Sequence, residues 1–347
     1  MKKTNYIILG VLVGLIIVII IIYNSGKDTE QRVLRDFFIE DTASINKIFL
    51  VDKRNQEITL KRQNGYWTVN DRYRARRDLV NLLLETFRRM EISSPVPKEK
   101  YDYVLRSISV KGIKCEIYQN NRLSKTYYVG GVTQDNTGTY MIMENSDVPF
   151  VVHIPGFSGY LTVRYNTFIN EWRERIVFNY HVNDIHKIYV EYPDNLNESF
   201  IAINNGNNQF DLKTINNQNV TFPFDTIKVK EFISRCKFIG FEAYIKEEIQ
   251  KKIIDSLKNE PVVSKFTIED FNGEKKSMKT YYRQNIEQAF DDEGILYDFD
   301  LERLYAVIQG GEEVVLIQYY IIDPISFKKS FFRAKNIEQA MLIKSDF

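Results

Sequence analysis

The longest uninterrupted apolar stretch of the chain lies near its start, at residues 6–23. These 18 residues include no charged, Pro or amide side chain, and a Tyr stands at each end. As a helix the stretch would be about 27 Å long, close to the hydrocarbon thickness of a bilayer. The pattern predicts a transmembrane anchor at 6–23, a cytoplasmic stub at 1–5 and a linker at 24–36.

A cleaved signal peptide is the alternative interpretation of this stretch. A secretory apolar core is about 7 to 15 residues long and ends at a cleavage site of small residues. Here the run is longer and is followed by Tyr23, Asn24 and Ser25, so an uncleaved anchor is favoured. Lys2 and Lys3 favour a cytoplasmic N-terminus, which would place the large C-terminal part outside the cytoplasmic membrane.

Beyond residue 36, short runs of Tyr, Phe, Ile and Val are separated by Asn, Gly and Asp, as is typical of strands and turns. The pattern that opens this region returns 140 residues later. The matching pairs are Phe38 and Phe178, Ile45 and Ile185, Lys47 and Lys187, and Ile48 and Ile188. Each copy continues with an Asn-Gly turn, at 64–65 and at 205–206. This repetition indicates an internal duplication.

Each copy then shows apolar residues at i, i+3, i+4 and i+7, which form one face of a helix. These residues are Val80, Leu83, Leu84 and Phe87 in the first copy and Val229, Phe232, Ile233 and Cys236 in the second. Four strand-like runs follow each helix. The order predicts an α+β chain with two tandem units, at 37–172 and 173–347, each an antiparallel sheet with one main packed helix.

The composition excludes some classes of partner but does not indicate a function. The 347 residues have a formal net charge of +1, so no strong field attracts nucleic acid, and no nucleic-acid partner is expected. Cys115 and Cys236 lie on apolar faces of a predicted strand and a predicted helix. Both are expected to be small buried hydrophobes, with a disulfide between them as the alternative.

Three stretches resemble a bacterial envelope family that is known only as a domain of unknown function. They are residues 150–161, the strand with Trp67 before the Leu-rich helix, and residues 127–131. The resemblance covers most of residues 37–335. It implies an extracytoplasmic β-rich repeat protein. Together with the predicted anchor, this places the chain in a bacterial inner membrane, with its large C-terminal part in the periplasm. Members of that family are often encoded beside auxiliary proteins of gliding-motility-type ABC transporters, so it also implies envelope partners of a transport, secretion or motility complex.

The residues usual in catalysis are scattered. His153, His181 and His186 have no ligand at metal spacing, and the motif around Ser158 departs from a nucleophile elbow because Gly159 follows directly. The acidic residues from Asp291 to Glu302 favour a solvated loop, with Ca²⁺ binding as the alternative. No catalytic residue, cofactor or metal site is predicted, and no small-molecule ligand is indicated.

Two surfaces are candidates for binding. Four arginines, Arg72, Arg74, Arg76 and Arg77, precede the first helix, where cations are unfavourable unless paired. Pairing with nearby acids is one interpretation, and a patch for an anion or a partner is the other. Gly10 and Gly14 form a small-residue face in the anchor that would allow contact with another membrane helix.

Glycosylation is a further possibility outside the cytoplasm. Thr42, Thr226 and Ser256 follow an Asp and precede an apolar residue, the pattern that some bacteria O-glycosylate. A role as helix or turn caps is the favoured alternative.

The sequence therefore predicts a non-enzymatic, single-span envelope protein that acts as an accessory or scaffold through protein–protein contacts. Exposed sheet edges are one route to such contacts. The alternative is a periplasmic glycan- or peptidoglycan-binding module, and an envelope hydrolase is a third interpretation.

Overall fold

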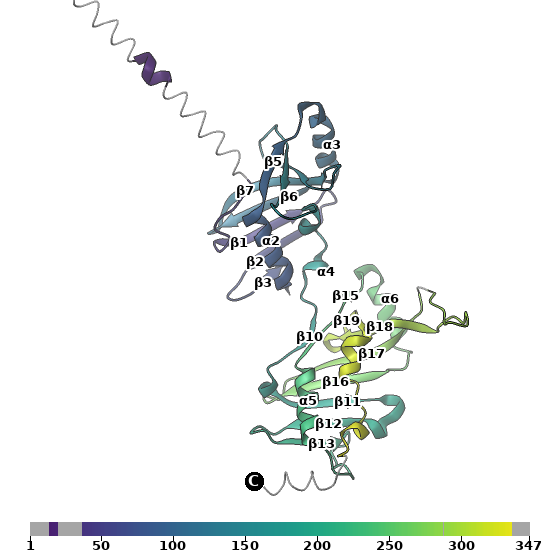
Figure 1. The fold of residues 1–347 in the computed structure, drawn as a ribbon. Coiled ribbons are helices and arrows are strands. Elements are labelled where there is room, and N and C mark those ends of the chain that lie inside the picture. Colours follow the sequence, from purple (N-terminus) through teal and green to yellow (C-terminus); the bar gives the residue numbers. More distant parts are fainter. Residues whose placement is uncertain (1–13, 20–36, 287, 335–347) are drawn as a thin grey trace, which may run out of the picture. The chain divides into compact units, whose positions relative to one another are not determined.

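The computed structural model describes residues 14–19, 37–286 and 288–334 of the chain. They belong to two compact units, Met1–Glu174 and Arg175–Phe347. Each unit is built on one large antiparallel sheet (Figure 1).

The first unit holds a nine-stranded sheet in the order β4-β3-β2-β1-β6-β7-β8-β9-β5. Its strands are β1 (Ile45–Val51), β2 (Glu57–Arg62), β3 (Trp67–Val69), β4 (Tyr73–Arg74), β5 (Glu91–Pro95), β6 (Ile113–Gln119), β7 (Arg122–Val132), β8 (Thr139–Met143) and β9 (Phe150–His153). Its helices are α2 (Arg77–Arg89), α3 (Tyr101–Lys111) and the short α4 (Ile169–Trp172).

The second unit holds an eight-stranded sheet in the order β13-β12-β11-β16-β17-β18-β19-β15. Its strands are β11 (Ile185–Glu191), β12 (Phe200–Asn204), β13 (Phe210–Thr214), β15 (Ala243–Tyr244), β16 (Ser264–Asp270), β17 (Lys275–Gln284), β18 (Phe299–Ile308) and β19 (Glu313–Gln318). A separate pair joins β10 (Ile176–Asn179) to β14 (Phe238–Gly240). Its helices are α5 (Thr226–Cys236), α6 (Glu247–Leu257) and the short α7 (Tyr319–Ile322).

The two sheets share one order of strands, with β1, β2 and β3 taking the places of β11, β12 and β13. The register agrees as well. Ile48 pairs with Ile117 in the first sheet and Ile188 with Ile268 in the second, and both strand pairs have a bulge just before Lys47 or Lys187. A one-residue slip would move every side chain to the opposite face, so this agreement fixes equivalent core positions.

The core of each unit lies between the sheet and one amphipathic helix. Val80, Leu83 and Phe87 of α2 are buried in the first unit, and Phe232 and Ile233 of α5 are buried in the second. A segment at the end of each unit closes the core. That segment contributes Leu161, Tyr165 and Trp172 to the first core and Ile322, Ile325 and Phe332 to the second.

A second helix covers the opposite face of each sheet. Val104 and Ile108 of α3 pack with Ile142 in the first unit. Leu257 of α6 packs with Tyr281 and Val314 in the second. Each sheet therefore has helices on both faces, and its two sides of alternating residues are both partly covered.

These observations correct the predicted fold class. The chain is mostly β-sheet with few helices, not an α+β chain with one main helix per unit. The prediction missed α3 and α6, which bury few residues: Val104 and Ile108 in α3, and Leu257 in α6. It also underestimated how much of each unit is strand.

The predicted membrane arrangement is corrected too. Within residues 14–19, 37–286 and 288–334, no helix is long and apolar enough to cross a membrane. This finding contradicts the prediction of a single-pass inner-membrane protein with a periplasmic C-terminal part. The stub at 1–5, the linker at 24–36 and the rest of 6–23 lie outside the described residues.

Candidate functional site

The connection between β17 and β18 is the most unusual surface of the second unit. Residues 285–298 join the two strands and form a hairpin that projects from the sheet (Figure 1). Large apolar side chains are exposed along this hairpin and its base. They are Tyr282, Ile286, Phe290, Ile295, Leu296, Tyr297, Phe299 and Leu301. Single exposed apolar residues are ordinary, but a contiguous group marks an interaction site.

Polar groups hold the hairpin in this shape. The side-chain amide of Asn285 donates to the carbonyls of Ala289 (2.8 Å) and Tyr297 (2.9 Å), and its oxygen accepts from the Ala289 N–H (3.0 Å). At the tip, Asp291 accepts from the N–H groups of Glu293 and Ile295. Side chains of the hairpin therefore satisfy several of its own backbone groups.

A bulge at the base of the hairpin orients the side chains there. Tyr282 of β17 pairs with Leu304 of β18, and Gln284 pairs with Phe299. Between these two pairs β18 therefore has more residues than β17. The extra residues of β18 bend the strand. As a result Asp300 is turned inward and is 8% exposed, while Leu301 is turned outward and is 55% exposed.

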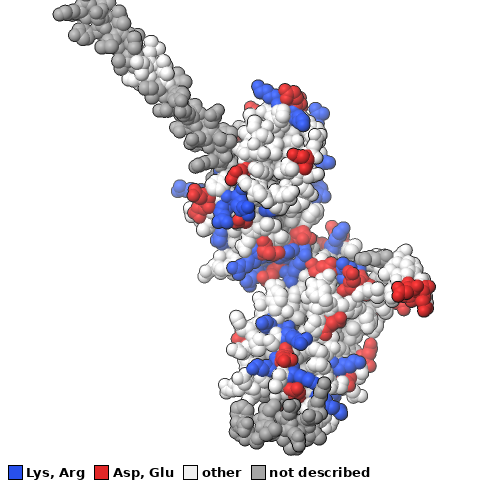
Figure 2. Space-filling model, viewed as in Figure 1, with Lys and Arg blue, Asp and Glu red and all other residues white. Residues whose placement is uncertain are grey.

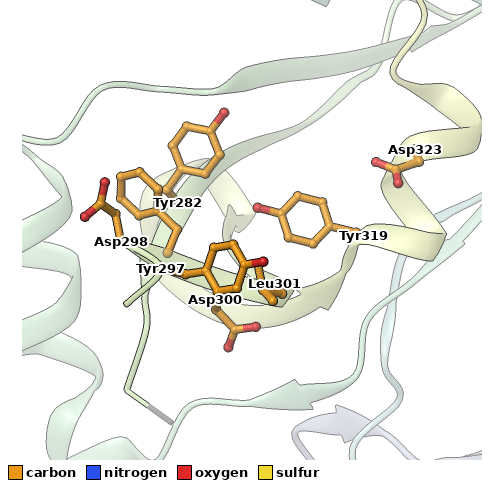
Figure 3. Close-up of a pocket in the computed structure, with 8 residues that line it drawn as sticks. Tyr282, Tyr297, Asp298, Asp300, Leu301, Tyr319 and Asp323 are labelled. Atoms are coloured by element: carbon orange, nitrogen blue, oxygen red, sulfur yellow. The ribbon is translucent and has the colours of Figure 1, made fainter. Parts of the chain in front are cut away.

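A pocket of about 520 Å³ lies at this base. Its lining combines rings with carboxylates and comprises Tyr282, Tyr297, Asp298, Phe299, Asp300, Leu301, Tyr319 and Asp323. The rings of Tyr282 and Phe299 are stacked, with centroids 4.6 Å apart. Figure 3 shows the hydroxyl of Tyr319, from α7, directed toward the rings of Tyr282 and Tyr297. Burial raises the pKa of Tyr319 above its ordinary value of 10, which further favours the neutral hydroxyl.

The electrostatics of the pocket are acidic. Asp300 forms an ion pair with Arg283, so its charge is compensated inside the protein. Asp298 and Asp323 also line the pocket, and no Lys or Arg of the described residues is within ion-pair distance of either side chain. Figure 2 shows acidic side chains gathered at the end of the projecting hairpin, with uncharged side chains beside them. The site thus joins negative charge to apolar surface.

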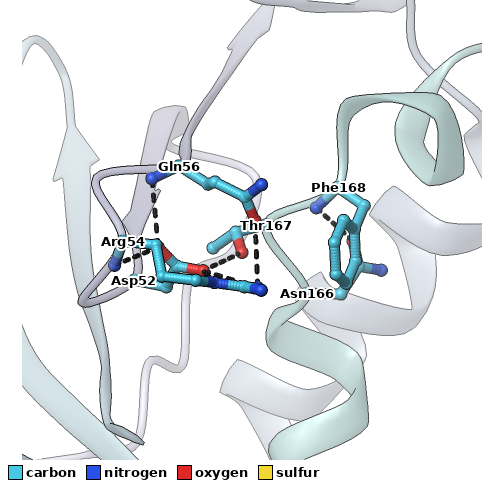
Figure 4. A network of polar contacts seen from close by, with 6 residues as sticks. All are labelled: Asp52, Arg54, Gln56, Asn166, Thr167 and Phe168. Atoms are coloured by element: carbon cyan, nitrogen blue, oxygen red, sulfur yellow. Dashed lines mark hydrogen bonds and ion pairs between the residues drawn. The ribbon is translucent and has the colours of Figure 1, made fainter. Parts of the chain in front are cut away.

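A second pocket, of about 420 Å³, lies in the first unit between the β1–β2 turn and the closing segment. Figure 4 shows how Asp52 organises its wall. The carboxylate accepts from the backbone N–H groups of Arg54 (2.8 Å) and Gln56 (3.0 Å) and from the Thr167 hydroxyl (3.1 Å). Burial opposes ionisation of Asp52, but these hydrogen bonds outweigh it and lower its pKa. This network fastens the turn to the closing segment, which is a structural role.

The predicted arginine patch lies in the first unit, from β4 to the start of α2. Arg76 pairs with Asp78 at 2.6 Å, and Arg74 pairs with Glu174 at 3.4 Å. Arg72 lies over the ring of Tyr73, and Arg77 is exposed at the start of α2. The hydrogen bond from Arg76 holds the pKa of Asp78 below its usual value. Neighbouring acids thus engage Arg74 and Arg76, and the anion patch stays a prediction.

The other predicted residues are not brought together. Gly14 belongs to the described helical residues 14–19, whereas Gly10 lies outside the described residues. Cys115 and Cys236 are free and buried, and burial raises the pKa of the Cys115 thiol to about 12, which keeps it unreactive.

In the described part of the chain, no three His, Cys, Asp or Glu residues are placed to hold a metal ion. Asp225 caps α5 by accepting from Ile227 and Lys228.

The sequence of the hairpin contains an apolar signal beside its acidic one. The acidic residues from Asp291 to Glu302 favoured a solvated loop, with Ca²⁺ binding as the alternative. A solvated loop rarely holds as many large apolar residues as Ile286, Phe290, Ile295 and Leu296. Apolar residues interleaved with acids, between two strands of one sheet, would have indicated an exposed contact surface.

Comparison of the chain with protein-family models, with curated proteins and with solved structures finds no match. The resemblance to the envelope family therefore stays a prediction.

Proposed function

We propose that this protein is a non-enzymatic scaffold that binds a partner protein through the β17–β18 hairpin. One observation carries the proposal: a locally hydrogen-bonded hairpin holds a group of large apolar side chains in solvent, including Ile295 at 60% and Leu301 at 55% exposure. Keeping this much apolar surface in water is unfavourable by about 25 cal/mol per Å². Covering it with a partner would recover that free energy.

The chemistry of the site supports binding over catalysis. The residues that line the pocket include no Ser, Cys, Lys or His beside the carboxylates. Asp300, the most buried of them, is already neutralised by Arg283. Aromatic rings with a polar tip are also the side chains enriched at protein interfaces. The assembly to which the partner belongs is a prediction that rests on the family resemblance alone.

Site-specific photocrosslinking in cells tests this proposal. A photoreactive phenylalanine analogue is placed at Leu296 in the hairpin or at Leu196, which is 60% exposed elsewhere in the same unit. We expect a discrete crosslinked protein from position 296 and none from position 196. Equal products from both positions, or none from position 296, would overturn the proposal.

A second measurement distinguishes glycan binding from protein binding at this site. Rings such as Tyr282 and Tyr297 can also stack on sugars, with carboxylates accepting from hydroxyl groups. If the partner is a protein, the pocket does not bind glycan. Purified peptidoglycan should then retain the wild-type protein and its Tyr282→Ala variant to the same extent. Retention of the wild type alone would favour the glycan.

A further inference from the structure

We infer that the hairpin and its pocket recognise a basic segment of the partner, an Arg or Lys flanked by apolar residues. The inference rests on the proposed function, because it names the chemistry of what the hairpin binds. The first observation that supports it is the charge of the hairpin. Residues 284–302 contain seven Asp or Glu and no Lys, Arg or His, in a chain whose net charge is only +1. Such a local imbalance attracts a cationic partner.

The pocket adds a place for the cation itself. Tyr282, Phe299 and Tyr319 present rings, and a guanidinium or ammonium group is attracted to the face of such a ring within about 6 Å of its centroid. Asp298 and Asp323 line the same pocket and can accept hydrogen bonds from the cation. The third acid, Asp300, is committed to Arg283. Two carboxylates beside ring faces suit one Arg or Lys side chain.

The surroundings of the pocket define the neighbours of that residue. Leu301 borders the pocket, and Ile295 and Leu296 continue the apolar surface toward the tip. A purely charged peptide would leave these side chains in water. A segment that alternates basic and apolar residues would cover them and also reach the tip acids Asp291 and Asp292. Charge alone therefore does not describe the ligand.

The first unit shows that this combination is not a general feature of the fold. At the equivalent connection, residues 133–138 form a short turn closed by hydrogen bonds of Thr133 with Asp135 and Gly138. This turn carries neither a projecting apolar group nor an acidic run. The unit 1 turn therefore supplies a replacement that removes the site and keeps the sheet connection.

Selection of peptides tests the inference. Random dodecapeptides displayed on phage are selected against the full chain and against a short-hairpin variant, in which residues 133–138 are copied in place of 285–298. We expect selected peptides to be at least about twofold enriched in Arg and Lys beside apolar residues, because two carboxylates and ring faces favour them. They should bind the short-hairpin variant at least about tenfold more weakly.

Isosteric variants then assign the binding to the pocket. The double variant Asp298→Asn, Asp323→Asn should weaken a selected peptide about tenfold, and the effect should shrink at high salt because ions screen the charges. Asp194→Asn, in the exposed 3₁₀ helix Pro193–Glu198 of the same unit, is the matched control and should change affinity less than about twofold.

The outcomes distinguish the two proposals. If the selected peptides require the hairpin but show no basic enrichment, the inference about the ligand is wrong and the hairpin remains a binding surface. If basic peptides bind the short-hairpin variant as tightly as the wild type, the proposed function fails as well. If Asp194→Asn weakens binding as much as the pocket variant, the pocket is not the site.

Discussion

Apart from the extra edge strand β4, the two sheets of this chain have the same order of strands. The two units differ in the connection that follows β7 in the first unit and β17 in the second. In the first unit, β7 and β8 are joined by a short polar turn at 133–138. In the second, β17 and β18 are joined by the longer segment 285–298 with its exposed apolar side chains. The sheet registers and the core positions are equivalent on either side of it. The fold therefore requires the shared strand order and core positions, whereas the long connection at 285–298 is particular to the second unit.

A second difference lies inside the shared sheet register. Lys47 pairs with Tyr118 in the first unit, whereas Lys187 pairs with Glu269 in the second. Lys47 lies over the Tyr118 ring, with 3.7 Å to its centroid. Glu269 instead accepts a hydrogen bond from the Tyr189 hydroxyl (2.7 Å) and pairs with Lys187 and Lys275. The same backbone position therefore holds a cation on a ring in one unit and a cluster of charges in the other.

The largest expected effect tests whether the two cores are equivalent. Phe87→Ala in α2 and Phe232→Ala in α5 each remove a ring that is fully buried. Each should lower the free energy of unfolding by about 3 to 5 kcal/mol, because a buried cavity adds to the lost transfer energy. Chemical denaturation measures both. A loss below about 1 kcal/mol for either variant would show that the two helices do not serve their cores equally.

The next effect concerns Glu269. Burial opposes its ionisation, but the hydrogen bond from Tyr189 and the pairing with Lys275 and Lys187 outweigh burial and hold its pKa at about 2, against an ordinary value of 4.5. A depressed pKa stabilises the folded state above pH 4.5, and that stabilisation is lost as pH falls toward 2. Between pH 7 and pH 3 the wild type should lose on the order of 2 kcal/mol that Glu269→Gln does not lose.

Denaturant unfolding at both pH values measures this difference. Glu274→Gln, on the exposed turn between β16 and β17, is the matched control and should keep the wild-type dependence on pH. If Glu269→Gln destabilises the protein equally at pH 7 and pH 3, the charge cluster does not distinguish the second unit in this way.

A smaller effect separates the starts of the two main helices. Asp225 caps α5 with its carboxylate, whereas Arg76 precedes α2 without a side-chain cap. Asp225→Ala should therefore cost about 1 kcal/mol of unfolding free energy. Arg76→Ala removes only an exposed pair with Asp78 and should cost less than about 0.5 kcal/mol. Thermal unfolding of the two variants ranks them, and a reversed order would contradict this account of the helix starts.

The smallest effect on stability is expected at the hairpin surface. Ile295→Ser with Leu301→Ser should change the free energy of unfolding by less than about 0.5 kcal/mol, because both side chains are already exposed. Leu196→Ser is the matched control. Urea titration measures the change, and a loss above about 2 kcal/mol would mean that these residues are part of the core.

Much of the shared architecture could be predicted from periodicity. The helical faces that include Val80, Phe87, Val229 and Phe232 are buried as expected, because one apolar stripe per helix is a strong local signal. Cys115 is buried on the strand Ile113–Gln119, as its place on the apolar side of that strand predicted. These features depend on residues near one another in the chain.

The features that the sequence did not predict depend on distant partners or on competing signals. Among the apolar residues of α3, only Val104 and Ile108 are fully buried, so its helical stripe was too narrow to recognise. The inward turn of Asp300 depends on Arg283 across a bulge, which no local pattern encodes. The carboxylates from Asp291 to Glu302 led to the prediction of a solvated loop, although large apolar residues lie between them. The predicted anchor at 6–23 rested on local signals: its length, its apolar composition, the Tyr at each end and the preceding lysines.

The central claim is that residues 285–298 are the added contact surface of the second unit. Its most direct test is the affinity of the partner crosslinked at Leu296 for the full chain and for the short-hairpin variant, measured by calorimetry. We predict a loss of at least about 100-fold, or about 2.7 kcal/mol, with a circular dichroism spectrum like that of the wild type. Undiminished affinity in a folded short-hairpin variant would contradict the claim.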